Sequence, residues 1–281
     1  MCGFLVINKN KINIQSFSLF LDKISHRGPD NTKITEYNNI FFGFKRLSIN
    51  DLSDISNQPF EDDDHIFVFN GEIYNHKEIK SQNNLNVENN SDSLVLFNLI
   101  KQKKRDFLKY LNGMFSFVFY DKKNNSFFAA RDIFGEKPLY YSFTKEGGII
   151  LSSEIKSILP LLENIEIDRE QVLNYFKNSH VSINKTIYQD IYSLPPGHYL
   201  TYKNQKLDIK KYWNKPTIDS SYALNYDNKE NIKKLLINSL DRQLDADVDV
   251  GLFLSGGIDS SLLLSLSKNL KKNLKTFSFS F

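Results

Sequence analysis

Residues 66–75 have the sequence IFVFNGEIYN, in which a run of β-branched and aromatic residues leads into Asn, Gly and Glu. Such runs are typical of β-strands. Four further runs share this character and are bounded by Asn, Asp, Gly or Pro: GMFSFVFYD (113–121), NSFFAARD (125–132), PLYYSF (138–143) and GIILSSE (148–154). Several short strands separated by turn residues predict an antiparallel, sandwich-like arrangement for this part of the chain.

Two helices are predicted beside these strands. Residues 17–29 (FSLFLDKISHRGP) place apolar residues at helical spacing and end at a Gly-Pro pair, which predicts an amphipathic helix that runs into a loop. Residues 91–111 (SDSLVLFNLIKQKKRDFLKYL) predict one longer helix, with Ser91 as its N-cap and Asp92 in its first turn. The first part of the chain is therefore expected to be an α+β domain.

The character of the sequence changes after about residue 190, so a second domain is predicted. A proline pair, a turn glycine and polar residues precede the only tryptophan, Trp213, which favours a boundary between residues 1–212 and 213–281. The later segment contains a helix at 228–240, the apolar run DVGLFL, a leucine-rich helix from about Ser260 to Leu270 and the apolar run TFSFSF. A strand covered on both sides, a helix and a second strand form a βαβ unit, the beginning of an α/β doubly wound parallel sheet.

Residues 255–261 (SGGIDSS) lie between the first strand and the helix of this predicted unit. Glycines after a buried strand allow a tight turn that points backbone N–H groups outward, and the N-terminus of the next helix adds partial positive charge. This geometry favours a bound phosphate. The segment lacks the Gly-Lys-Ser/Thr ending of the usual P-loop, and on the glycine pair alone a plain tight turn remains the alternative.

The chain contains a single cysteine, Cys2, so no disulfide can form within it. If Met1 is removed, the thiol and a free α-amine lie on the same residue, and the amine, with a pKa of about 8, can serve as the general base. Such a nucleophile needs no histidine partner. The alternative is that Cys2 is a small buried hydrophobic residue.

The overall composition argues against several function classes. The formal net charge is +3, with 36 basic and 33 acidic residues mixed along the chain, which favours neither a nucleic acid nor a membrane surface as partner. We expect no leader peptide, and no apolar run approaches the roughly 18 residues that span a bilayer. A cytoplasmic protein is expected, since a lone reduced thiol suits that compartment.

Six motifs occur in order before SGGIDSS, namely MCGF, HRGPD, RLSI, NGEIYN, RDIFGEKPLYY and SSEIK. This ordered set resembles the glutamine-dependent asparagine synthetase family, and the resemblance extends over essentially the whole chain. It implies a class II glutaminase (glutamine amidotransferase) domain at residues 1–212, with four αββα layers of the N-terminal-nucleophile type. It also implies the start of an ATP-binding synthetase domain at residues 213–281, in which SGGIDSS resembles a pyrophosphate loop.

The resemblance further implies roles for individual residues. Cys2 would attack the glutamine carboxamide, while the Asn70 side-chain amide and the Gly71 N–H would stabilise the tetrahedral oxyanion. Arg46 would bind the substrate α-carboxylate, and Glu72 and Asp92 would bind its α-ammonium. The glutamine pocket would include Arg46, Leu47, Ser48, Ile49 and Asn50, and the ATP site would include Leu254, Ser255, Gly256, Gly257, Asp259, Ser260, Ser261 and Phe279.

Taken singly, these residues have simpler interpretations. An Asn-Gly pair such as Asn70–Gly71 is a common hairpin turn, and Asp92 suits the N-terminal dipole of a helix. Arg46 could be a surface base, and His26 and Arg27 could only brace a loop. The ordered set of motifs, rather than any one residue, favours the functional interpretation.

The leading functional hypothesis is glutamine-hydrolysing asparagine synthesis, in which ammonia from glutamine amidates aspartate through an aspartyl adenylate. Glutamine, ATP with Mg²⁺ and aspartate are the expected partners; no tightly bound cofactor is expected, and the sequence leaves any metal ligands undefined. One alternative is amidation of a sugar carboxylate for a surface polysaccharide, and another is a glutaminase or glutamine-binding fragment without synthetase activity. Because family members continue well beyond this length, we expect a truncated chain that acts as a homodimer or with a complementing C-terminal chain.

Overall fold

The structure, a computed structural model, describes residues 1–8, 12–87, 89–103, 105–217, 228–271 and 274–279. Contacts within the chain divide it into two compact units, residues 1–48 with 53–214 and residues 49–52 with 215–281. Among the described residues, no helix is both long and apolar enough to cross a membrane.

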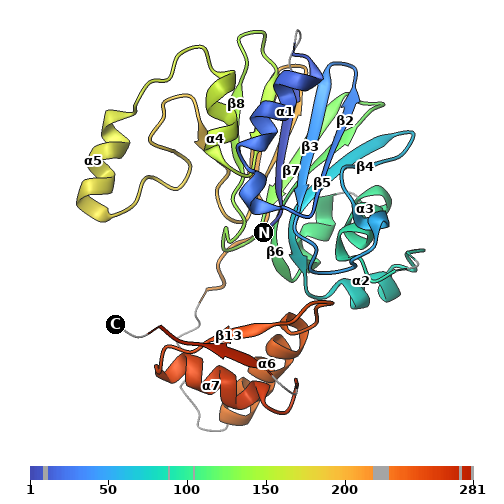
Figure 1. Cartoon of the computed structure of the whole chain (residues 1–281), viewed down its shortest axis with the longest axis vertical. Helices are drawn as coiled ribbons and strands as arrows, with labels where there is room; N and C mark the ends of the chain where they lie inside the picture. The colour runs from blue at the N-terminus through green and yellow to red at the C-terminus, as the bar shows by residue number, and fades with distance from the viewer. Residues whose placement is uncertain (9–11, 88, 104, 218–227, 272–273, 280–281) are drawn as a thin grey trace. The chain divides into compact units, whose positions relative to one another are not determined.

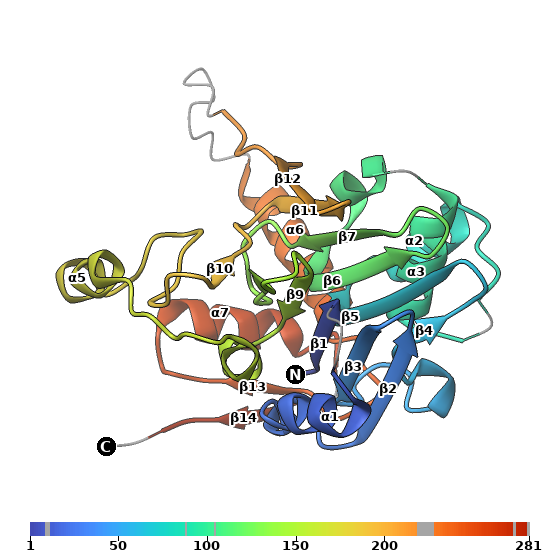
Figure 2. The same ribbon diagram turned by 90° about the horizontal axis from the view of Figure 1, so that it is seen from above.

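Two six-stranded antiparallel sheets form the first unit (Figures 1 and 2). The β1 sheet has the strand order β10 (Tyr192–Ser193), β8 (Tyr140–Phe143), β9 (Ile149–Ser152), β1 (Gly3–Asn8), β3 (Ile40–Arg46) and β2 (Asn31–Tyr37). The β5 sheet has the order β12 (Lys206–Lys211), β11 (His198–Lys203), β7 (Ser126–Arg131), β6 (Gly113–Asp121), β5 (His65–Ile73) and β4 (Phe60–Glu61). The five strand-like runs of the sequence correspond to β5 to β9, so the predicted antiparallel sandwich is confirmed.

Alternation along the central strands builds the layer between the sheets. Phe4 and Val6 of β1 lie in this layer, as do Ile66 and Val68 of β5, because every second side chain of a strand faces the same side. All four are fully buried. Burial of a side chain of this size contributes about 1.5–3 kcal/mol, so the layer between the sheets is a main source of stability.

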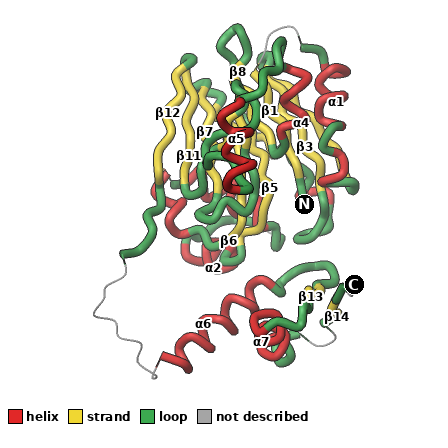
Figure 3. The backbone as a smooth tube through the Cα atoms, turned by 90° about the vertical axis from the view of Figure 1, so that its left-hand side faces the viewer, coloured by secondary structure: helices red, strands yellow, loops and turns green. Residues whose placement is uncertain are grey.

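Helices cover the outer faces of both sheets (Figure 3). Leu5 and Ile7 of β1 pack in one core with helix α1 (Ile14–Asp22) and the short α4 (Ile155–Ile158), whereas α2 (His76–Gln82) and α3 (Asp92–Gln102) pack on the β5 sheet. The first unit is therefore an αββα sandwich, as predicted. Its other described helical elements are α5 (Arg169–Asn178) and the 3₁₀ turns Ser25–Arg27, Asp54–Ser56, Arg105–Tyr110 and Leu159–Leu161.

The helix predicted over residues 91–111 begins as expected but is shorter. The Ser91 Oγ accepts a hydrogen bond from the Leu94 N–H at 3.3 Å, so the predicted N-cap is confirmed. The prediction of one long helix is wrong, because α3 ends at Gln102 and a 3₁₀ turn follows from Arg105. The physical reason is the polar run KQKKRD at 101–106, which offers the core no apolar face.

The pair Asn70–Gly71 does not form a hairpin turn. Both residues lie inside β5, where they are opposite Ser116 and Phe115 of β6. The turn interpretation is therefore wrong. Buried side chains continue beyond the pair to Ile73, and this continued pairing with β6 keeps the dipeptide extended.

The second unit contains α6 (Asn228–Gln243), β13 (Gly251–Phe253), α7 (Ile258–Ser267) and β14 (Lys275–Phe277). The two strands pair in parallel with α7 between them in the chain, which is the predicted βαβ unit. The expectation that the first strand is covered on both sides is wrong for the described residues, because the Phe253 side chain is 72 % exposed. Two short strands and two helices do not supply a layer for each face of the sheet. Residues 280–281 of the second apolar run lie outside the described residues.

Candidate active site

The thiol of Cys2 lies at one end of the layer between the two sheets. Cys2 directly precedes β1, and its side chain packs against the same core as Phe4 and Val6. On β5, Asn70 and Glu72 continue the alternation of Ile66 and Val68, which places their side chains on the face toward the β1 sheet. The period of the two strands thus brings predicted site residues from distant parts of the sequence to one end of the sandwich.

Backbone groups of Leu47 hold the Cys2 thiol. The Leu47 N–H donates to Cys2 Sγ at 3.3 Å, and the thiol donates to the Leu47 carbonyl oxygen at 3.4 Å. Burial raises the pKa of the thiol, although the hydrogen bond from Leu47 and the charge of the N-terminal amine act in the opposite direction. A thiol of this kind needs a base to become a nucleophile.

The N-terminal amine, which interacts electrostatically with the Cys2 thiol, is the candidate for that base. Burial lowers the pKa of the amine in the chain that retains Met1, and the positive charges of Arg27 and Lys137 act in the same direction while the Cys2 thiol opposes them. A lower pKa increases the fraction of free amine at neutral pH. The surroundings of the chain terminus therefore favour the form that can accept a proton.

The side-chain amide of Asn70 carries a donor without an acceptor. Asn70 is 1 % exposed, and its Nδ2 atom is buried with no hydrogen-bond partner among the described residues. Nearly all buried donors in proteins are paired. An unpaired donor directed into the same layer as the Cys2 thiol is what an oxyanion site requires.

The backbone N–H of Gly71 points away from β6. On β6, the Phe115 N–H donates to an Asp132 carboxylate oxygen at 3.1 Å, and the Phe115 carbonyl oxygen accepts from the Asp132 N–H at 2.8 Å. Phe115 therefore makes no ladder hydrogen bonds with Gly71, the residue opposite it. Gly71 is also the only residue type that fits, because a Cβ atom there would lie 2.2 Å from the Met114 carbonyl oxygen.

The backbone N–H groups of Phe69, Gly71 and Ile73 all point to the side of β5 that faces away from β6. The first donates to Gln58 Oε1 at 2.6 Å and the last to Asp92 Oδ2 at 2.8 Å. The described residues provide no acceptor for the Gly71 N–H between them. The two predicted oxyanion donors, on adjacent residues, are thus both available to a ligand.

Two carboxyl groups lie near these donors. Asp92 accepts hydrogen bonds from the N–H groups of Ile73 and Ser93, and burial, aided by the charge of Glu72, raises its pKa to about 7. Burial also raises the pKa of Glu72, whereas the positive charge of Lys137 opposes that rise. Neither carboxyl group takes part in an ion pair among the described residues, so a cationic ligand group would offset the cost of burying both carboxylates.

Arg46 is buried rather than on the surface. Its side chain donates from Nη1 to the Ser53 carbonyl oxygen at 2.8 Å and to Asn57 Oδ1 at 2.7 Å, and the residue is 5 % exposed. The interpretation of Arg46 as a surface base is therefore wrong. These contacts fix the guanidinium group at the end of β3.

The other predicted pocket residues follow Arg46. Leu47 contacts the thiol as described, and the Ser48 N–H donates to an Asp30 carboxylate oxygen at 2.7 Å. Ile49 and Asn50 are half-buried. Asp30 belongs to the HRGPD motif, so that motif helps to hold the segment that contacts the thiol.

Lys137 is a residue that the sequence did not single out. It is 6 % exposed, and burial lowers its pKa while the charges of Glu72 and Cys2 oppose the decrease. Asp132 fixes the loop that presents it, because the Asp132 carboxylate accepts from the N–H groups of Phe134, Glu136 and Lys137 at 3.0 Å. Asp132 and Lys137 both belong to the motif RDIFGEKPLYY, and this motif is the feature of the sequence that could have indicated the arrangement.

The predicted ATP loop forms the connection between β13 and α7. Gly256 has a φ of +80°, Gly257 is the N-cap of α7, and the hydroxyls of Ser255 and Ser260 lie 3.1 Å apart. Asp259 lies in the first turn of the helix. The remaining predicted residues, Leu254, Ser261 and Phe279, lie in or after this βαβ unit, and Phe279 is 81 % exposed. Both a phosphate loop and a plain tight turn are compatible with this geometry.

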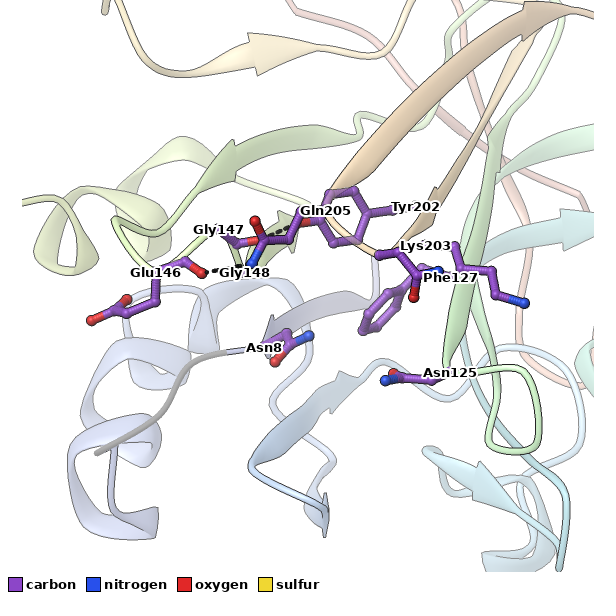
Figure 4. Close-up of a pocket in the computed structure, with 10 residues that line it drawn as sticks. Asn8, Asn125, Phe127, Glu146, Gly147, Gly148, Tyr202, Lys203 and Gln205 are labelled. Atoms are coloured by element: carbon purple, nitrogen blue, oxygen red, sulfur yellow. Dashed lines mark hydrogen bonds between the residues drawn. The ribbon is translucent and has the colours of Figure 1, made fainter.

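A cavity of about 270 Å³ lies away from the candidate site (Figure 4). Its lining includes Asn8 at the far end of β1, Asn125 before β7, and residues 146–148 and 202–205. The length of β1 separates it from Cys2 by about 20 Å, at roughly 3.3 Å per residue. None of the predicted site residues lines this cavity.

Comparisons with known proteins give matches to the first and to the last part of the chain. A family model described as a glutamine amidotransferase domain matches residues 1–213, and one described as asparagine synthase matches residues 231–281. The chain is 33 % identical to asparagine synthetase [glutamine-hydrolyzing] 1 of Bacillus subtilis, with 100 % of this chain and 46 % of the relative covered. It is 36 % identical to putative asparagine synthetase [glutamine-hydrolyzing] 2 of Methanocaldococcus jannaschii, with 92 % and 55 % covered.

Two further comparisons are with a relative of a different name and with a solved structure. The amidase chyE of Penicillium rubens is 32 % identical, with 90 % of this chain and 38 % of the relative covered. The structure of glutamine phosphoribosylpyrophosphate amidotransferase from Bacillus subtilis matches with a TM-score of 0.58 at 13 % identity, covering 99 % of this chain and 65 % of that one. This last likeness shows a shared fold. The chain spans about half the length of the curated relatives it matches.

Proposed function

The chain belongs to the glutamine amidotransferase family, and we propose that it hydrolyses glutamine at Cys2 to release ammonia. The observation that carries this proposal is the buried Asn70 Nδ2 that no described residue accepts from. A buried unpaired donor costs about 1–3 kcal/mol. A tetrahedral oxyanion formed at the thiol would accept from this donor and from the Gly71 N–H.

The reaction proceeds in two balanced steps after removal of Met1. In the first, Cys2 Sγ bonds to the carboxamide carbon, and the thiol proton passes to the Cys2 α-amine and on to the departing nitrogen, which leaves as ammonia. The product is a thioester between Sγ and the glutamyl group. In the second, water attacks the thioester carbonyl carbon, the C–S bond breaks, and glutamate and the thiol are released.

Charged residues around the thiol account for substrate binding. Arg46 binds the glutamine α-carboxylate, because a guanidinium fork matches a carboxylate. Glu72 and Asp92 bind the α-ammonium, which supplies the positive charge that these buried carboxylates lack. Leu47 holds the thiol in place through its backbone groups and lines the pocket with Ser48.

The ammonia serves an ATP-dependent amidation of aspartate through an aspartyl adenylate. Support comes from the match of residues 231–281 to an asparagine synthase model and from the names of the relatives. The turn at Gly256 and the N-terminus of α7 would bind the phosphates. Mg²⁺ would enter as the ATP complex, with phosphate oxygens and the Asp259 carboxylate as its ligands.

Amidation of another carboxylate, such as that of a sugar acid, is the second candidate. One relative is named as an amidase rather than as an asparagine synthetase, so the names of the relatives do not all specify aspartate as the acceptor. A third candidate is glutamine hydrolysis without synthetase turnover. The chain is therefore incubated with glutamine, ATP, Mg²⁺ and either aspartate or a sugar acid, while glutamate, pyrophosphate and the amide are measured separately.

The nucleophile is tested with Cys2→Ala and Cys2→Ser. We expect both variants to lose glutamate formation while keeping the unfolding midpoint, and a glutamine-analogue electrophile to add mass only to the N-terminal peptide. Gln205→Ala, in the cavity at the other end of β1, is the matched control and keeps full activity. Wild-type glutamate formation by Cys2→Ala would overturn the proposal.

A further inference from the structure

The Arg27 side chain joins Cys2 to Glu154, a residue that lies 127 positions after Arg27 in the sequence. Its Nε donates to the Cys2 carbonyl oxygen at 2.8 Å, and its Nη1 donates to Glu154 Oε1 at 2.9 Å. Arg27 is 8 % exposed. A buried guanidinium group requires a counter-charge, and Glu154 is the carboxylate that contacts it in the described part of the chain.

The contact with Arg27 matters because Cys2 has few other anchors. Strand pairing in β1 begins at Gly3, which lies opposite Lys45. Once Met1 is removed, no peptide precedes Cys2, so its carbonyl group and its thiol are the groups that fix its orientation. The packing is close, since a Cβ atom at Gly3 would lie 2.9 Å from Arg27 Cδ.

Glu154 is itself tied to the first strand. The Glu154 N–H donates to Ser152 Oγ at 3.1 Å, and the same hydroxyl donates to the Phe4 carbonyl oxygen at 3.1 Å. The Phe4 N–H in turn donates to Ser153 Oγ at 3.1 Å. The backbone of Glu154 and the start of β1 therefore share one rigid frame, and the carboxylate reaches back from this frame to Arg27.

Three basic side chains contact the Glu154 carboxylate, those of Arg27, His26 and Lys156. Besides Arg27, His26 Nε2 lies 2.8 Å from Oε1 and Lys156 Nζ lies 3.2 Å from Oε2. Burial acts to raise the pKa of Glu154, but hydrogen bonds from Arg27, His26 and Lys156 lower it overall. The group is thus held as a carboxylate, which is the form that neutralises Arg27.

We propose that Glu154 is a positioning residue for the Cys2 nucleophile, acting through Arg27 on the Cys2 carbonyl group. The inference rests on the proposed role of Cys2 in glutamine hydrolysis. The Glu154 side chain contacts His26, Arg27 and Lys156 rather than Arg46, Glu72 or Asp92, which are proposed to bind the charged groups of glutamine. Its loss should therefore affect the orientation of the thiol and not the binding of glutamine. The SSEIK and HRGPD motifs, which the proposed reaction does not use directly, acquire a common role.

The test compares Glu154→Ala, Glu154→Gln and Glu154→Asp. The backbone hydrogen bonds of residue 154 do not involve its side chain, and Glu154→Gln and Glu154→Asp keep an acceptor for Arg27, so these two variants should fold even where loss of the side chain destabilises Glu154→Ala. We expect kcat for glutamine hydrolysis to fall about 10- to 100-fold in Glu154→Ala, as for a small misplacement of a reacting group, with KM within about twofold of wild type. Glu154→Gln keeps an acceptor but loses the charge, so its kcat should lie between those of the wild type and Glu154→Ala. Glu154→Asp keeps the charge on a shorter side chain and should also recover part of the wild-type kcat.

Alkylation of Cys2 by a glutamine-analogue electrophile provides a second readout, and its rate should fall in parallel with kcat. Glu163→Gln is the matched control, because Glu163 forms an exposed ion pair with Lys145 and should keep wild-type kcat and alkylation. Wild-type kcat in Glu154→Ala, or a change confined to KM, would overturn the inference. Cys2→Ala is measured in parallel: if it remains active, the proposed function fails, whereas an inactive Cys2→Ala beside a fully active Glu154→Ala refutes the positioning role alone.

Discussion

Asn70 combines a cost in stability with a proposed function. Its buried Nδ2 donor has no acceptor among the described residues, and a donor that is waiting for an oxyanion contributes only when the tetrahedral intermediate forms. The predicted role of Asn70 came from the NGEIYN motif, while the unpaired donor became visible only in the structure.

Asn70→Ala should therefore lower turnover rather than binding. We expect kcat to fall about 10²- to 10³-fold, the usual effect of losing one oxyanion donor, with a small change in KM. Asn70→Asp, which keeps the size but removes the donor, should lose at least as much. Steady-state kinetics with glutamine separates the two parameters, and an increase confined to KM would contradict the oxyanion role.

The pKa of about 7 at Asp92 predicts a pH dependence of substrate binding. Below that value Asp92 is protonated and cannot pair with the glutamine α-ammonium, so KM should rise as the pH falls from 8 to 6. In Asp92→Asn the KM should be high and flat over this range. A wild-type KM that does not change between pH 6 and 8 would contradict the assignment.

The raised pKa of Asp92 also makes the free energy of unfolding depend on pH. Its pKa is raised from 3.8 to about 7 on folding, so the folded chain takes up a proton between these values. The stabilising contribution is complete below the lower pKa and is lost as the pH rises toward 7. Chemical denaturation across this range should show the free energy of unfolding of the wild type falling relative to that of Asp92→Asn, and parallel curves would contradict the shift.

The residues that sequence reasoning missed are those defined by long-range contacts. Cys2 and Asn70 stand in recognisable motifs. Glu154 follows β9 and Lys137 lies in the loop after β7, and both act on groups near the N-terminus only because these segments fold next to it. No local sequence pattern predicts such long-range contacts. Their motifs were visible, but the partners of the side chains were not.

At the scale of elements, the runs of β-branched and aromatic residues predicted the strands, but two local interpretations, one of a turn and one of a helix end, were wrong. The Asn70–Gly71 pair has a turn-like composition, yet pairing with β6 keeps it extended. The helix predicted over residues 91–111 has the expected N-cap at Ser91, but the loss of an apolar face after Gln102 ends it early. In both cases tertiary packing outweighed the local preference.

Gly71→Ala tests the close approach of β5 and β6. An added Cβ atom would lie 2.2 Å from the Met114 carbonyl oxygen and 2.7 Å from Phe115 Cα, and these are backbone atoms that cannot rotate away. We expect a loss of about 1–3 kcal/mol in the free energy of unfolding, as for other overpacked sites, and a fall in kcat as the N–H shifts. An unchanged unfolding midpoint would contradict the geometry.

At the scale of the whole molecule, the two units carry separate parts of the proposed function. The residues proposed for glutamine hydrolysis belong to the unit formed by residues 1–48 and 53–214, whereas the proposed phosphate loop belongs to the other unit. The sequence predicts a boundary near Trp213 from the proline pair, the turn glycine and the polar residues that precede it.

Ser260→Asp tests that separation. A carboxylate in the first turn of α7 suits the positive end of the helix, so the variant should fold, but it repels the phosphates that the same N–H groups would bind. We expect Mg²⁺–ATP affinity, measured by calorimetry, to fall at least about tenfold, a coupling of roughly 1.4 kcal/mol, while glutamate formation without ATP stays at the wild-type rate. Ser239→Asp, on the exposed surface of α6, makes the same charge change away from the loop and should leave both measurements unaltered. Equal ATP affinity in Ser260→Asp and the wild type, or no binding by the wild type, would leave the loop as a plain tight turn; a parallel loss of glutaminase activity would instead show that the two units do not work separately.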